Sequence, residues 1–139
     1  MDCKQFWNHI AQKKIAICGI GISNTPLIMN FVEKGARVVA CDRRRRDQIG
    51  ELADKLEAAG VELQLGERYL ENLEVDIIFR TPGMNFNLPE LEVARKKGIA
   101  VTSKMEVFFD LCPCKLFAVT GSDGKTTTTT ITSELAVFL

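Results

Sequence analysis

Short apolar runs alternate with longer amphipathic stretches over the first hundred residues. Strand-length runs occupy residues 14–18, 37–41, 61–65, 75–79 and 99–101. Between them, apolar residues recur at helical spacing over 27–34, 49–59 and 91–97, and a glycine closes each of these stretches. The alternation predicts an α/β fold with a Rossmann-like parallel sheet and helices on both of its faces.

The pattern changes near residue 112. Residues 105–111 have helical spacing, and Cys112-Pro113-Cys114 then interrupts the chain. A second apolar run at 116–120 leads into a glycine-rich turn and a segment that can be helical. We therefore expect a Rossmann-like domain over residues 1–112, and over 113–139 the first strand, phosphate loop and helix of a truncated second domain.

The glycine-rich turn has the composition of a phosphate-binding loop. In such a loop backbone N–H groups hold phosphate oxygens, a lysine reaches the terminal phosphates, and a hydroxyl binds Mg²⁺. Lys125 and Thr126 would take the last two roles. Val119 stands where the general Walker pattern has its first glycine, so only the shorter form is met. The predicted ATP-binding residues are Gly121, Ser122, Asp123, Gly124, Lys125, Thr126 and Thr127.

A second glycine turn follows the first apolar run. Residues 19–24 read Gly-Ile-Gly-Ile-Ser-Asn, the position of the dinucleotide fingerprint, with Asn24 in place of the third glycine. Ser23 is expected to cap the next helix, with Pro26 in its first turn. Asp42 ends the second apolar run, where an acidic residue reads a ribose or another nucleotide hydroxyl.

Two further segments follow strands at the expected ligand-binding edge. The four arginines at 43–46 could hold a 2′-phosphate or a diphosphate, and at least two of them should face solvent. Thr81-Pro82-Gly83 follows the fourth apolar run, and Gly83 would permit close approach of the backbone to a ligand.

Composition points to no charged partner. Eighteen basic residues balance eighteen acidic ones, so charge gives no reason to expect nucleic acid. No apolar run has the length of a membrane span, and the N-terminus lacks the order of a signal peptide. The five cysteines suggest no zinc pairing, and Cys18 and Cys41 are expected to be buried. We expect a reduced cytoplasmic protein without a membrane partner.

Together these motifs resemble the Mur ligases of bacterial peptidoglycan synthesis. The phosphate loop is similar to that family's Thr-Gly-Thr/Ser-Asn-Gly-Lys-Ser/Thr form, with Asp123 at the usual asparagine. Within the family, Thr81-Pro82-Gly83, Asn87-Leu88-Pro89 and Met105-Glu106-Val107-Phe108 look most like the D-glutamate-adding members. The L-alanine-adding members are the alternative.

The resemblance implies that the chain is the front part of a three-domain ligase that depends on ATP and Mg²⁺. The ligase would join D-glutamate to UDP-N-acetylmuramoyl-L-alanine through an acyl phosphate, and it would be a monomer. Lys125 would be catalytic. Gly21, Ile22 and Ser23 would belong to the UDP-substrate site, with Ile22 and Ser23 at the diphosphate. Asp42, Arg43 and Arg44 would meet the uridine, and Gly83 would line the same pocket. This chain alone should bind a UDP-sugar and not ligate.

Two other classes of function stay open. An NAD(P)-binding oxidoreductase or regulatory domain is favoured by Asp42 and the arginines, and disfavoured by the Gly-Lys-Thr loop. A non-catalytic nucleotide-binding module would use the same two glycine turns. Titration with NADH and NADPH separates the first of these from a ligase.

Overall fold

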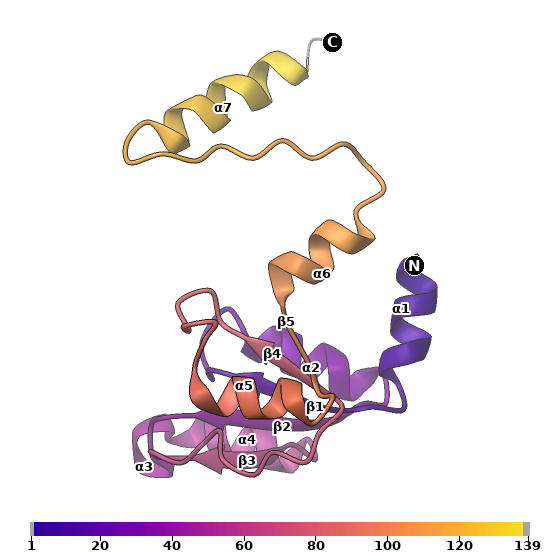
Figure 1. Cartoon of the computed structure of the whole chain (residues 1–139), viewed down its shortest axis with the longest axis vertical. Helices are drawn as coiled ribbons and strands as arrows, with labels where there is room; N and C mark the ends of the chain where they lie inside the picture. Colours follow the sequence, from indigo (N-terminus) through magenta and orange to yellow (C-terminus); the bar gives the residue numbers. More distant parts are fainter. Residues whose placement is uncertain (1, 138–139) are drawn as a thin grey trace.

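Parallel strands form a sheet in the order β3-β2-β1-β4-β5 (Figure 1). The structure, a computed structural model, describes residues 2–137, so residue 1 of the predicted first domain and residues 138–139 of the second lie outside it. The strands are β1 (Lys14–Cys18), β2 (Arg37–Asp42), β3 (Glu62–Leu65), β4 (Ile77–Arg80) and β5 (Ala100–Ser103). The predicted α/β class and parallel sheet are confirmed.

Helices cover both faces of this sheet. The helices of the described chain are α1 (Cys3–Ile10), α2 (Thr25–Glu33), α3 (Arg46–Ile49), α4 (Glu51–Ala58), α5 (Pro89–Lys96), α6 (Lys104–Leu111) and α7 (Lys125–Ala136), of which α7 does not contact the sheet. Helices α1, α2, α4 and α6 pack against one face, and α5 packs against the other. Figure 1 shows α7 and the long segment before it standing apart from the sheet.

The side chains of β1 explain why both faces must be covered. Ile15 and Ile17 join the apolar cluster under α1, α2 and α4, whereas Ala16 and Cys18 join the cluster under α5. All four side chains are buried. A strand buried on both sides needs apolar residues at successive positions, which is why the sequence shows a continuous run here.

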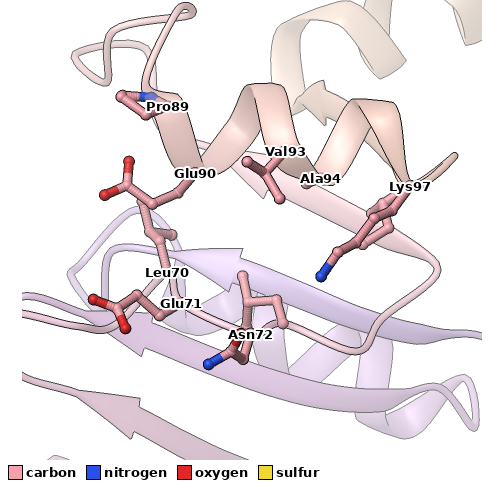
Figure 2. A pocket seen from close by; sticks show the side chains of 10 residues that line it. Leu70, Glu71, Asn72, Pro89, Glu90, Val93, Ala94 and Lys97 are labelled. Carbon is pink, nitrogen blue, oxygen red and sulfur yellow. The ribbon is translucent and has the colours of Figure 1, made fainter.

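The second face has an irregular crossover in place of a helix. Residues 66–76 connect β3 to β4 without regular structure and cover this face with Leu70 and Leu73. A cavity of about 330 Å³ remains between this segment and α5 (Figure 2). Glu71 and Asn72 border it from the crossover, Val93 borders it from α5, and Lys97 borders it from just after that helix.

Two predicted elements differ from the structure. The helix expected over 49–59 is divided into α3 and α4 at Gly50, which adopts a positive φ of 66°. The strand expected over 116–120 does not form, because no strand within residues 2–137 pairs with it. An extended segment without a hydrogen-bonding neighbour is not a strand.

Candidate nucleotide-binding site

The glycine turn lies at the carboxyl end of β1, at the edge where the parallel strands end together. It is anchored at its start, where the Gly19 N–H donates to the Cys41 carbonyl of β2 at 2.7 Å. Within residues 2–137, the backbone N–H groups of Gly21, Ile22 and Ser23 donate no hydrogen bond. Adjacent free N–H groups before a helix are suited to an anion.

Asn24, which stands where the dinucleotide fingerprint has its third glycine, supports the turn. Asn24 is buried, and its Nδ2 donates to the carbonyls of Cys18 at 3.0 Å and Gly19 at 2.9 Å. The asparagine therefore fixes the end of β1 and the start of the turn. Asn24 is also the N-cap residue of α2, although its side chain makes no capping bond. The prediction that Ser23 caps this helix is therefore wrong, while Pro26 does lie in the first turn.

Asp42 holds the glycine turn and Arg44 together. One carboxylate oxygen accepts from the Ile20 N–H at 2.7 Å, and the other accepts from the Arg44 N–H at 2.9 Å and from Arg44 Nε at 3.1 Å. Arg44 Nη2 also donates to the carboxylate at 2.9 Å and to the Ile20 carbonyl. Burial alone would raise the pKa of Asp42, but these hydrogen bonds outweigh it and leave the pKa below its ordinary value. The carboxylate is thus ionised at neutral pH and used within the protein.

The other three arginines of the run at 43–46 differ in their contacts. Arg46 pairs with Asp54 and Glu57 of α4, so its side chain supports α4. Arg45 is exposed and precedes α3, and its N–H donates to Gln48 Oε1 at 2.9 Å. Arg43 is exposed beside the end of β2. Of the two arginines predicted to meet a uridine, Arg44 is held by Asp42, and Arg43 lies between these two residues in sequence with its side chain exposed.

A shallow cavity of about 260 Å³ is formed by this edge. It brings together Gly21, Ile22, Ser23 and Asp42 of the predicted set. Thr81 also lines it, whereas Gly83, two residues further along and exposed, and Arg43 do not. Thr81 approaches Gly19 so closely that a Cβ there would lie 2.9 Å from Thr81 Cγ2. Sequence reasoning thus found the turn and missed Asn24 and Thr81 as its supports.

The predicted phosphate loop is exposed along its whole length. Gly124 adopts a left-handed φ of 73° and precedes α7, and the N–H groups of residues 121–127 donate no hydrogen bond within the described chain. Lys125 Nζ folds over the loop and contacts the carbonyl of Gly121 and, at 3.2 Å, that of Ser122. A free N–H array with a lysine above it has the donor chemistry that a nucleotide phosphate needs.

Three larger cavities are lined by other residues. One is the cavity beside α5, a second, of about 410 Å³, is formed mainly by apolar side chains of α1, α2 and α6, and a third, of about 380 Å³, lies beside Asp76 and Gly98. None of the three is lined by Gly21, Ile22 or Ser23, whose free backbone N–H groups mark the turn. The two buried cysteines, Cys18 and Cys41, face each other in the β1–β2 register, and burial raises the pKa of Cys18 to about 12. They pack as apolar residues, as predicted.

These features define an open parallel α/β domain with a glycine turn of free backbone N–H groups after its first strand, followed by an exposed glycine-rich loop. Residues 13–103 match the family model of the N-terminal domain of MurD-like Mur ligases. The chain therefore belongs to the Mur ligase family, in its MurD-like branch, and the resemblance predicted from its motifs is confirmed.

Known proteins similar to the chain agree with this family. It is 48% identical over 132 residues to a UDP-N-acetylmuramoylalanine–D-glutamate ligase of Clostridium botulinum (strain Okra / Type B1), covering 94% of the chain and 29% of that protein. The corresponding ligase of Clostridium novyi (strain NT) is 48% identical over 128 residues, or 91% of the chain and 28% of that protein.

A solved structure, the UDP-N-acetylmuramate–alanine ligase MurC of Thermotoga maritima, superposes with a TM-score of 0.58 at 25% identity. The superposed region covers 88% of the chain and 28% of that protein. The chain therefore spans less than a third of the length of these relatives. In the part that the structure describes, no helix is both long and apolar enough to cross a membrane.

Proposed function

We propose that this chain supplies the UDP-substrate-binding domain, and the beginning of the ATP-binding domain, of a cytoplasmic ligase that joins D-glutamate to UDP-N-acetylmuramoyl-L-alanine. The glycine turn carries the proposal. Its free N–H groups at Gly21, Ile22 and Ser23 line a cavity at the edge where nucleotides bind in such folds. The similarity to D-glutamate ligases supports the choice of substrate.

The residues of the turn divide the work of binding. The N–H groups of Ile22 and Ser23 would donate to the diphosphate, and Gly21 leaves room because nothing lies within 4 Å of where its Cβ would be. Asp42 positions the turn through Ile20, and Arg43 and Arg44 provide positive charge beside the uridine. Gly83 remains the predicted wall of the pocket on the side of β4.

The phosphate loop would hold ATP. Residues 121–127 offer free N–H donors, Lys125 would leave the carbonyls of Gly121 and Ser122 to reach the terminal phosphates, and the exposed Thr126 hydroxyl would bind Mg²⁺. ATP supplies the phosphoryl group that activates the substrate carboxylate for attack by the D-glutamate amine. The positive charge of Lys125 would stabilise that group during transfer.

Calorimetric titration tests the proposal directly. We expect the chain to bind UDP-N-acetylmuramoyl-L-alanine and UDP. In a separate product assay with D-glutamate and ATP added, we expect no release of ADP or phosphate. Preference for NADH or NADPH over UDP would instead favour a dinucleotide-binding domain. Formation of the D-glutamyl product by this chain alone would contradict the proposal that it binds the UDP-substrate without completing the ligation.

A further inference from the structure

A lysine from the far end of the sheet reaches the glycine turn. Lys104 Nζ donates to the Ser23 carbonyl at 3.0 Å and contacts the Ser23 hydroxyl, across 81 positions of sequence. Lys104 is the first residue of α6 and follows β5 directly, so the sheet brings it to the same edge as the turn. The contact therefore joins the residue after the outer strand β5 to the turn after the central strand β1.

The helix that carries Lys104 gains nothing from its charge. A cation in the first turn of a helix faces the positive end of the helix dipole, which is unfavourable. Ser103 already caps α6 by accepting the Glu106 N–H at 3.3 Å. The lysine is therefore placed against the preference of its own helix, and its position needs a reason outside α6.

The surroundings of Lys104 orient its side chain and leave its charge available. Its stem borders the apolar cavity formed by α1, α2 and α6, so the ammonium group is directed to the polar edge. The nearby carboxylate, Glu106, pairs with Arg80 at 3.3 Å and accepts from Thr102 at 3.4 Å. Within residues 2–137, Lys104 has no ion pair of its own.

We propose that Lys104 is a diphosphate-binding residue of the glycine turn, which moves from Ser23 to a phosphate oxygen when the ligand arrives. The inference rests on the proposed function, because it deepens the description of the same site. The free N–H groups of Ile22 and Ser23 supply neutral donors, and Lys104 adds the full charge that a diphosphate requires. It makes the site selective for the diphosphate over the bare nucleoside.

The test compares UDP with uridine, which lacks both phosphates, on the full chain of 139 residues. UDP affinity is measured by calorimetry, and the weaker uridine affinity is measured by chemical-shift titration. Lys104→Met should weaken UDP binding about tenfold to a hundredfold and leave uridine binding unchanged. Lys104→Arg should restore most of the UDP affinity. The salt dependence of UDP binding should fall in Lys104→Met, because one screened charge is lost.

Lys96→Met is the matched control, since Lys96 is an exposed lysine in the last turn of α5. It should bind both ligands as the unmodified chain does, and urea unfolding checks that each variant is folded. Equal UDP affinity of Lys104→Met and Lys96→Met overturns the inference and leaves the proposed function standing. An equal loss of UDP and uridine binding would reduce Lys104 to a support of the turn. If the unmodified chain binds neither UDP nor its muramoyl derivative, the proposed function fails, and the inference with it.

Discussion

The glycine turn after β1 and the phosphate loop before α7 both offer free backbone N–H groups, yet they are held in different ways. Asn24, Asp42 and Thr81, from three separate parts of the chain, support the glycine turn. Within residues 2–137, the side-chain hydrogen bonds of the phosphate loop run from Lys125, the first residue of α7, to carbonyls of the loop itself. Every residue from 113 to 137 is exposed. A glycine-rich sequence thus specifies the donors, whereas the tertiary contacts around it decide how firmly they are arranged.

The largest difference between the two regions should appear in amide hydrogen exchange. Helix α7 has twelve residues, and its first six are Lys125 followed by five threonines, Thr126 to Thr130. All of its residues are exposed. Isolated helices of that length are marginal in water. Amides of α7 should therefore exchange at least about a thousandfold faster than those of β1 and β2, which open only on global unfolding. Equal protection of α7 and β1 would contradict the comparison.

Asp42→Ala should break the glycine turn most severely among single substitutions. It removes the acceptor of the Ile20 N–H and leaves the Arg44 guanidinium without its partner. We expect the free energy of unfolding, measured with urea, to fall by roughly 2–3 kcal/mol. Asp54→Ala is the control, because Asp54 forms an exposed ion pair with Arg46, and it should change the midpoint little. Similar losses in both variants would mean that Asp42 is no more than another surface charge.

Gly19→Ala should be the next most damaging change. Gly19 has a φ of 87°, and a Cβ there would lie 2.9 Å from Thr81 Cγ2. Strain and crowding together should cost about 1–3 kcal/mol in urea unfolding. Gly21→Ala, where no atom lies within 4 Å and φ is not positive, should stay within about 0.5 kcal/mol of the unmodified chain. The prediction fails if the two alanine variants are equally stable.

A smaller effect is expected from acid. The pKa of Asp42 is lowered in the folded chain, so its ionisation stabilises the fold fully above the ordinary carboxyl pKa of about 3.9. That stabilisation is lost as the pH falls through the lower, folded-state pKa. The difference in unfolding free energy between the unmodified chain and Asp42→Asn should be constant near neutral pH and shrink below about pH 4. A difference that does not change with pH would exclude this linkage.

The smallest effect on stability should come from the phosphate loop. Lys125 Nζ contacts only carbonyls of its own loop, so Lys125→Ala should leave the urea midpoint of the sheet domain unchanged. The same substitution should abolish any ATP binding, because the lysine is the loop's cation. A clear loss of sheet stability would show that the loop is coupled to the domain, which would weaken the contrast between the two regions.

The sequence predicted best what depends on local pattern. The runs at 14–18 and 37–41 became β1 and β2 almost unchanged, because strands buried on both faces leave an unmistakable apolar signal. The glycine turn was found for a similar reason, since two glycines and a following helix lie close together in the chain. Here the local signal and the tertiary structure agree.

The sequence predicted least what depends on distant partners. The run at 116–120 has strand composition but no neighbouring strand in the described chain. Asp42 has the position of a ligand-binding acid, and only the structure shows its oxygens already accepting from Ile20 and Arg44. Lys104 carried no signal beyond its place after the last apolar run, because its contact with Ser23 spans 81 positions.

That span also sets an order of assembly. Asp42 meets Ile20 over 22 positions of chain, whereas Lys104 meets Ser23 only after β4 and β5 have been added beyond β1. Closing the longer loop costs more chain entropy and cannot precede synthesis of its final residue. During translation, the turn would therefore gain its hydrogen bond to Asp42 first and its contact with Lys104 last. The growing chain would resemble a nucleoside site before it became a site for a diphosphate.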